Sequence, residues 1–247
     1  MAKQLGRGMS PAHPVNDMEK TMDTAKKYAP SNLNEVIYPS KAVELRIKAY
    51  AAGEMSGHIM LHGPNGTGKT TVARLLVSAI GGQDARLETA DYDELLAKPK
   101  LRDYMRNASA WSRLTPGDKY FMVLNEFDNA KRGMSKFWTA LDECEDGAMA
   151  IITTNHVMNI DRSVRSRFDM IEFAGVSALA ALPRIQYALK AEGVQLPDAQ
   201  VLYYLAQVEH LMDLRKYFKK ADELIFLQKN GLAFPSWKPI KPTLQVI

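Results

Sequence analysis

The sequence predicts an α/β fold, in which helices cover both faces of a mainly parallel sheet and a small helical domain follows. Short apolar runs typical of buried strands alternate with stretches of helical spacing; the runs are residues 58–62, 120–124, 148–153 and 170–173. Strands that alternate with helices favour a parallel sheet covered on both faces. After Phe173 only helical patterns remain, roughly at residues 177–192, 197–208 and 212–229.

A helix is expected just ahead of the first strand, over residues 40–52. Its apolar residues recur at helical spacing, Ser40 is a typical N-cap, and Gly53 stands where such a helix ends. The chain then enters the strand at residues 58–62.

The 247 residues are enough for one sizeable α/β core and a small satellite domain. We expect a flexible N-terminal arm without apolar periodicity, a core, a helical lid and a proline-containing tail; they span residues 1–30, 31–174, 175–230 and 231–247. The arm and the tail are the segments in which a partner protein is expected to bind.

Composition places the chain among soluble globular proteins, because hydrophobic residues make up 46% and charged residues 24%. No apolar run approaches the roughly 20 residues of a membrane span, and no secretory signal is recognised, so a cytoplasmic location without a membrane partner is expected. The net charge of +4 permits contact with nucleic acid but does not require it. Cys144 lies among acidic residues that disfavour a thiolate, and no chemical role is expected for it.

The strongest motif lies between the first strand and the next helix and satisfies G-x-x-x-x-G-K-[ST], a phosphate-binding loop. Lys69 is expected to reach the β- and γ-phosphates of ATP, and Thr70 to ligate Mg²⁺ through its hydroxyl. The alternative is a glycine-rich turn that only links the strand to the helix. The predicted nucleotide-binding residues are Gly63, Pro64, Asn65, Gly66, Thr67, Gly68, Lys69, Thr70 and Thr71.

A second acidic segment follows the strand at residues 120–124 and looks like a Walker B motif. Glu126 is placed to orient the attacking water, the alternative being a solvated acidic turn. Asn125 stands where most such motifs carry aspartate, and its amide oxygen can accept a hydrogen bond from a metal-bound water but brings no charge. Thr70 and Asn125 are the candidate Mg²⁺ residues, with slower hydrolysis or weaker Mg²⁺ binding expected.

Together these motifs resemble the AAA+ family and, within it, the ATPase module of small clamp-loader subunits. The resemblance runs from about residue 27 to 229, and residues 27–37 are similar to the clamp-loader opening segment, with Ala29 in place of its arginine. The sequence ends soon after the lid, so the helical collar of clamp-loader subunits is not expected in this chain.

The resemblance implies roles for three further residues. Asn155 would be sensor 1, which helps to hold the nucleophilic water; Arg167 would be an arginine finger for the neighbouring subunit, with Arg165 as the second choice; Arg215 would be sensor 2. The alternatives are an asparagine that forms a turn, a surface arginine pair, and an arginine that pairs with Asp213 at a helix start.

The resemblance further implies an ATPase that assembles as a homo-oligomer, a ring or a filament, and uses ATP and Mg²⁺. Three interpretations remain open: loading or remodelling of a complex on DNA, a slow nucleotide switch that recruits a protein partner, and remodelling of proteins without nucleic acid. Basic side chains that would meet DNA phosphates are Lys98, Lys100, Arg102, Arg106, Lys131 and Arg132, although solvated charge is the commoner reason for such residues.

Overall fold

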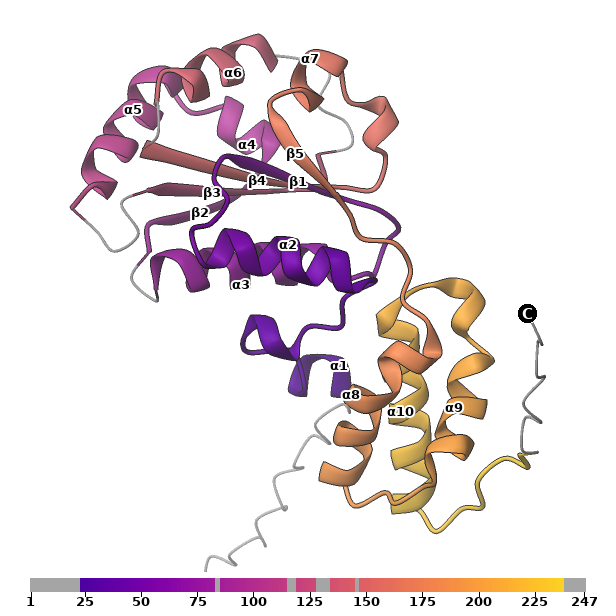
Figure 1. Cartoon of the computed structure of the whole chain (residues 1–247). Coiled ribbons are helices and arrows are strands. Elements are labelled where there is room, and N and C mark those ends of the chain that lie inside the picture. Colours follow the sequence, from indigo (N-terminus) through magenta and orange to yellow (C-terminus); the bar gives the residue numbers. More distant parts are fainter. Residues whose placement is uncertain (1–22, 83–84, 115–118, 128–133, 145–146, 238–247) are drawn as a thin grey trace, which may run out of the picture.

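The computed structural model describes residues 23–82, 85–114, 119–127, 134–144 and 147–237. In the first part of the chain, strands and helices alternate (Figure 1). Its strands are β1 (His58–His62), β2 (Leu87–Asp91), β3 (Tyr120–Asn125), β4 (Ala148–Thr154) and β5 (Phe168–Glu172). Its helices are α1 (Thr24–Lys27), α2 (Lys41–Ala51), α3 (Lys69–Gly81), α4 (Tyr92–Leu96), α5 (Leu101–Ser112), α6 (Met134–Asp142) and α7 (Arg162–Arg165).

The strands form one sheet in the order β2-β3-β4-β1-β5, and every pair in it is parallel. The carboxyl ends of all strands therefore lie at one edge, where α/β proteins bind ligands. The predicted α/β fold with a parallel sheet is confirmed. The sequence prediction missed β2, because this edge strand, Leu-Glu-Thr-Ala-Asp, is too polar to stand out as an apolar run.

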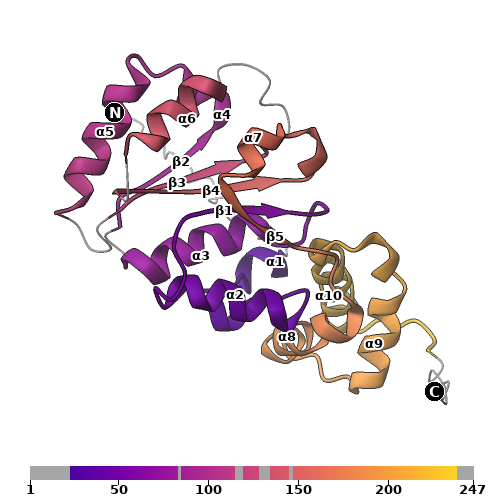
Figure 2. The ribbon, with the colours of Figure 1, turned by 45° about the horizontal axis from the view of Figure 1, so that its top comes forward.

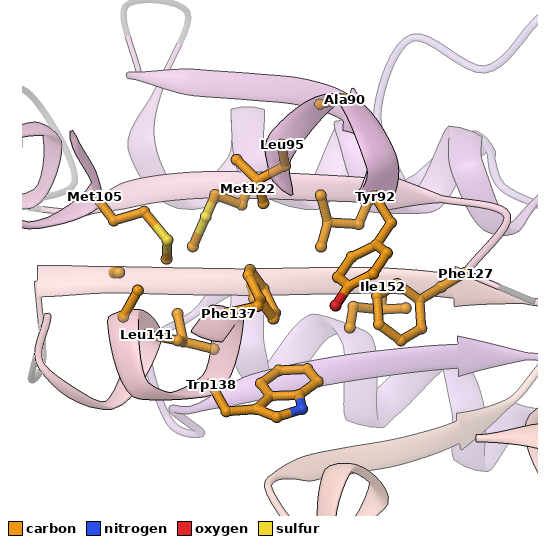
Figure 3. Packing of buried hydrophobic residues seen from close by; sticks show 14 of the residues in the cluster. Ala90, Tyr92, Leu95, Met105, Met122, Phe127, Phe137, Trp138, Leu141 and Ile152 are labelled. Carbon is orange, nitrogen blue, oxygen red and sulfur yellow. The ribbon is translucent and has the colours of Figure 1, made fainter. Parts of the chain in front are cut away.

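Helices cover both faces of the sheet (Figures 1 and 2). On one face α2 and α3 pack through a cluster that includes Ile47, Val72 and Leu76. On the other face α4, α5 and α6 enclose an aromatic cluster in which the Phe137 and Trp138 ring centroids are 4.5 Å apart (Figure 3). Cys144 belongs to this second cluster, and burial raises the pKa of its thiol to about 11. The thiolate is therefore disfavoured, as predicted from the sequence.

The later part of the chain contains α8 (Ala178–Ala191), α9 (Asp198–Ala206) and α10 (Leu214–Lys229), as the helical patterns predict. These helices form their own apolar core beside the sheet, with Ile185, Tyr204 and Tyr217 fully buried in it (Figure 1). Short 3₁₀ turns complete the described elements at η1 (Leu33–Glu35), η3 (Val157–Asn159) and η4 (Glu209–Leu211). None of the helices in the described residues is long and apolar enough to cross a membrane.

Residues 23–30, which were expected in the flexible arm, instead form α1 and a turn that pack on the helical part. The Thr24 hydroxyl donates to the Phe218 carbonyl at 3.1 Å, and the Thr24 amide donates to the Asp222 carboxylate at 3.0 Å. Residues 231–237 contain no helix, as expected, and Tyr204 donates to the Pro235 carbonyl at 2.6 Å. The rest of the expected arm, residues 1–22, and of the tail, residues 238–247, lies outside the described residues.

Candidate functional site

The glycine-rich loop connects the end of β1 to the first turn of α3. Gly63 has φ 140°, and a Cβ there would lie 2.1 Å from the Phe173 carbonyl oxygen. Gly66 and Gly68 also have left-handed backbones, with φ 74° and 90°. Such a backbone turns successive N–H groups toward one point, and the N-terminus of α3 adds its partial positive charge there.

Lys69 begins α3 and is held against the loop. Its side chain is buried, and its ammonium donates to the carbonyls of Gly63 at 2.8 Å and Pro64 at 2.6 Å. The Thr67 hydroxyl braces the same turn through the Pro64 carbonyl at 3.1 Å. The loop therefore holds a positive charge beside the amide groups that would surround a phosphate.

The loop forms one wall of a pocket of about 320 Å³, within the size range of ligand sites. The pocket brings together Asn65 to Thr71 with Glu126, Asn155 and Arg215, which come from four separate parts of the chain. The rest of the lining includes a mainly apolar set of residues that would suit a base and sugar; it consists of Ala25, Ala29, Pro30, Glu35, Val36 and Ile37 with Arg184. Gly63 and Pro64 belong to the loop without lining the pocket.

Glu126 follows β3 directly and faces the pocket with an exposed side chain. Its backbone is left-handed, with φ 49°, which is uncommon for a residue other than glycine. Thr153 of β4 contacts this turn twice. Its hydroxyl accepts from the Glu126 amide at 3.3 Å, and its carbonyl accepts from the Phe127 amide at 2.9 Å.

The residues at this edge fit a magnesium ion that is held jointly by the protein and by phosphates. The Asn125 amide oxygen is buried and accepts no hydrogen bond from the described residues, so a donor such as a metal-bound water would satisfy it. No group of three His, Cys, Asp or Glu side chains in the described residues could hold a metal alone. Mg²⁺ commonly binds with few protein ligands plus phosphates and water. Thr70 lines the pocket, whereas Asn125 does not line it but directly precedes Glu126, which does.

Arg215 reaches the pocket from the first turn of α10. Asp213 caps this helix by accepting from the Arg215 amide at 2.9 Å, and it also accepts from the Arg215 Nε at 3.1 Å. The Leu214 amide donates to the Gly66 carbonyl at 3.0 Å, which attaches the helix start to the phosphate-binding loop. Arg215 therefore lines the pocket and pairs with Asp213 in one arrangement, and its role as sensor 2 stays a prediction.

Arg167 and Arg165 lie at the end of α7 and do not line the pocket of their own chain. Arg167 donates to the Ser163 carbonyl at 2.8 Å and to the Asp142 carboxylate at 3.4 Å. The Arg165 Nη1 lies 3.7 Å from the Met158 sulfur, whereas its Nε is buried without a partner among the described residues. Neither arginine is placed to act on the nucleotide of the same chain.

Among the residues that line the pocket, Arg184 of α8 joins the helical part (α8, α9 and α10) to residues 23–37, the entry segment. Its guanidinium donates to the Tyr28 carbonyl at 3.0 Å and to the Glu35 carboxylate at 3.1 Å. The backbone N–H of Ser31, assisted by the Ser31 hydroxyl and the Arg184 guanidinium, holds the pKa of Glu35 below its ordinary value. The wall of the pocket is thus built from segments far apart in the sequence.

A basic groove lies between the α4–α5 junction and α6, away from the pocket. It is lined by Lys98, Lys100, Arg102, Ser135, Lys136 and Thr139, together with apolar residues. Lys98 pairs with Glu88 at 2.7 Å, and Arg102 pairs with Glu143. Arg106 pairs with Asp103 and does not line the groove, whereas Lys131 and Arg132 lie outside the described residues.

Comparison with known proteins shows which family model and which relatives the chain matches. Residues 59–176 match the model of the ATPase family associated with various cellular activities (AAA). The sliding-clamp-loader large subunit of Escherichia phage RB69 is 27% identical over 219 residues, covering 85% of this chain and 66% of that protein. The replication factor C small subunit 2 of Pyrobaculum arsenaticum is 26% identical over 182 residues, covering 70% of this chain and 54% of that protein. The chain thus spans between about half and two thirds of these relatives' length.

Among solved structures, the RuvB Holliday junction branch migration motor of Thermotoga maritima superimposes with a TM-score of 0.55. It is 17% identical, and the match covers 83% of this chain and 75% of that one. At this level of identity the likeness supports the fold alone.

Some residues of the pocket and of the basic groove could not be identified as candidates from the sequence. Thr153 was assigned no role of its own, because its contact with Glu126 joins two strands that only the fold brings together. Arg184 contacts Glu35 of the expected opening segment from 149 residues away, so no local pattern marks Arg184. Lys136 joins the basic groove through the packing of α6 on α5, for which the sequence carries no signal.

Proposed function

Because the chain contains a domain of the AAA ATPase family and resembles clamp-loader subunits, we propose that it binds ATP with Mg²⁺ and hydrolyses it. The observation that carries the proposal is the single pocket that gathers the phosphate-binding loop, Glu126, Asn155 and Arg215. Each of these residue types has a separate task in phosphoryl transfer, and their convergence is not expected of a structural turn.

The loop residues position the nucleotide. Backbone amides of residues 65–70 and the α3 N-terminus hold the phosphates, and the Lys69 ammonium exchanges its carbonyl partners for phosphate oxygens. Mg²⁺, when bound, neutralises charge on the β- and γ-phosphate oxygens. In this role the Thr70 hydroxyl would hold the ion directly, and the Asn125 amide oxygen would accept a hydrogen bond from its water shell.

Glu126 orients the attacking water and accepts its proton, because its carboxylate stands at the end of β3 on the pocket side. Asn155 holds the same water from the end of the neighbouring strand β4. Arg215 approaches the γ-phosphate from the helical part, so that closure of this part on the nucleotide completes the site.

Arg167 serves the nucleotide of a neighbouring copy. It is exposed at the end of α7 and lies outside its own pocket, which supports a role in trans. An arginine supplied in this way contributes about 10³ to 10⁵ in rate where a finger operates. The proposal therefore includes a homo-oligomer, ring or filament, whose contacts run through the nucleotide.

We further propose that the assembly loads or remodels a complex on DNA. Two of the relatives are named as a sliding-clamp-loader subunit and a replication factor C subunit, and the basic groove offers lysine ammonium groups and hydroxyls that suit a phosphate backbone. Asn125 favours a second candidate, a slow switch that assembles with ATP and recruits a protein, since the amide withholds a charge from the metal site.

The test measures ATP turnover and particle mass, with and without DNA, for the wild-type protein and for Lys69→Ala. The motor proposal predicts an ATP-dependent oligomer whose turnover rises with DNA, and loss of both properties in the variant. Assembly with ATP but background turnover, whatever the DNA, would instead favour the switch. Turnover that persists in Lys69→Ala would exclude this pocket as the site of ATP hydrolysis.

A further inference from the structure

We infer that Thr153 is a positioning residue for Glu126, which it holds in the backbone conformation that presents the carboxylate to the pocket. The inference rests on the proposed function for its catalytic meaning, and on two hydrogen bonds for its geometry. Thr153 is 3% exposed and lines the pocket through which the carboxylate would act.

The need for such a residue arises where the sheet ends. The paired register of β3 and β4 stops at Leu124 and Ile152, and the pairing of β3 with β2 stops one residue later, at Asn125. Glu126 is the first residue past the end of β3 and has no ladder partner in either neighbouring strand. Glu126 then adopts φ 49°, a left-handed conformation that costs free energy in a residue with a side chain. Contacts outside the regular ladder must stabilise it.

Thr153 supplies those contacts from both its side chain and its backbone. The hydroxyl accepts from the Glu126 amide at 3.3 Å, and the carbonyl accepts from the Phe127 amide at 2.9 Å. Phe127 is fully buried in the aromatic cluster, which anchors the far side of the turn (Figure 3). Glu126 is therefore held between a buried ring and the end of β4.

The arrangement couples two catalytic positions through one strand end. Asn155 follows Thr153 by two residues, so a movement of the β4 end shifts the candidate water-holding amide and the Glu126 turn together. Since a misplacement of about 1 Å can cost about a hundredfold in rate, a rigid link between these residues has direct value for turnover.

The two amide hydrogen bonds allow a test with an internal control. Thr153→Val removes the hydroxyl acceptor but keeps the carbonyl, whereas Thr153→Ser keeps both. Hydrogen exchange of the Glu126 and Phe127 amides is followed by NMR in ¹⁵N-labelled protein, alongside ATP affinity and turnover for the wild type and both variants.

We expect Thr153→Val to speed exchange of the Glu126 amide about tenfold, the equivalent of one net hydrogen bond, and to change the Phe127 amide less than about twofold. Turnover falls about tenfold at nearly constant ATP affinity, and Thr153→Ser restores both exchange and turnover. This split separates positioning from a loss of binding.

Three results would overturn the inference: unchanged exchange at Glu126 in Thr153→Val, equal acceleration of both amides, which means general loosening, or faster Glu126 exchange with unchanged turnover. Wild-type protein that binds ATP without turnover would contradict the proposed function instead. The amide exchange would still decide whether Thr153 holds the turn, so the two failures are distinguishable.

Discussion

At the residue scale, Gly66 joins the phosphate-binding loop to the start of α10. Its φ is 74°, and a Cβ there would lie 1.8 Å from an Asp213 carboxylate oxygen. Gly66→Ala must therefore displace Asp213, which caps α10 and holds Arg215. We predict that ATP affinity falls at least about tenfold in this variant, measured by titration with a fluorescent nucleotide.

Gly53→Ala is the matched control for this prediction. Gly53 has nearly the same backbone, with φ 75°, but no atom lies within 4 Å of the Cβ that the substitution adds. Gly53→Ala therefore introduces the same kind of backbone strain, of order 1–3 kcal/mol, without a steric clash. Equal losses of ATP affinity in both variants would mean that general destabilisation of the fold, and not the contact with Asp213, causes the effect.

Asn125 sets the charge beside the candidate magnesium site. Asn125→Asp adds a carboxylate where a buried amide oxygen has no partner among the described residues, so the site should hold Mg²⁺ more firmly. We predict a several-fold lower Mg²⁺ concentration at half-maximal turnover, measured by titration at saturating ATP. Asn34→Asp adds the same charge at an exposed position and should leave the Mg²⁺ dependence as it is in the wild type. No shift in Asn125→Asp would place the ion elsewhere.

The phosphate-binding loop is predictable from the sequence because its function depends on consecutive residues between one strand and one helix. The residues that complete the pocket are less so. Thr153 and Arg184 act through contacts with Glu126 and Glu35, which lie 27 and 149 positions away in the chain. A local sequence pattern carries no information about these long-range contacts, because they depend on strand order and on how α8 packs.

At the element scale, Glu192 joins α1 to the ends of α8 and α10. Its carboxylate at the end of α8 accepts from Lys27, the last residue of α1, from Lys229 at the end of α10 at 3.0 Å, and from Tyr28 after α1 at 2.9 Å. The hydrogen bonds from Lys27, Lys229 and Tyr28 lower the pKa of Glu192 to about 2. Since the folded pKa is depressed, the stabilisation is present above about pH 4.5 and is lost as the pH falls toward 2.

We predict that Glu192→Gln lowers the free energy of unfolding at pH 7, and that the difference from the wild type shrinks between about pH 4.5 and 2. Urea unfolding at several pH values measures this difference. Among the described residues, Glu223 pairs only with Lys220, within α10. Glu223→Gln should therefore change the free energy of unfolding only slightly. A pH-independent difference for Glu192→Gln would mean that packing, and not charge, accounts for its contribution.

The basic groove between α5 and α6 carries the prediction for DNA. Lys100 and Lys136 line it, and their ammonium groups make no hydrogen bond or ion pair with the described residues, so both are available to phosphates. We predict that Lys100→Ala and Lys136→Ala each weaken DNA binding and each lower the slope of log affinity against log salt by about one. Fluorescence anisotropy at several salt concentrations measures both quantities.

Lys219→Ala is the control, because it removes the same charge from an exposed position on α10. If it weakens DNA binding as much as the groove variants do, the attraction comes from the net charge of the chain. Unchanged affinity in both groove variants would exclude the groove as the DNA contact.

Elements with a strong local pattern are the ones that the sequence predicts. β1, β3 and β4 read as apolar runs because both faces of the sheet are covered, whereas β2 is a polar edge strand and was missed. The segment at 24–27 lacks apolar periodicity, and its order comes from Thr24 and Lys27 binding to the helical part. Tertiary contacts, rather than propensity, decide these cases.

At the scale of the whole molecule, the nucleotide pocket is enclosed by the sheet edge, the entry segment and the helical part. Leu214 bonds to the phosphate-binding loop, and Arg184 bonds to the entry segment, so both of these parts of the pocket depend on the position of the helical part. Nucleotide binding is therefore expected to move the helical part against the sheet. α7 lies on the face of the sheet opposite to α2 and α3 (Figures 1 and 2).

In the proposed oligomer, one subunit supplies the phosphate-binding loop and its neighbour supplies Arg167. The most direct test mixes two variants, Lys69→Ala and Arg167→Ala, and measures ATP turnover of each alone and of the mixture. We expect each variant to be inactive alone and the mixture to regain part of the wild-type turnover, because some interfaces pair an intact Lys69 with an intact Arg167. Full turnover by Arg167→Ala alone, or no recovery in a mixture that still assembles, would contradict this proposal.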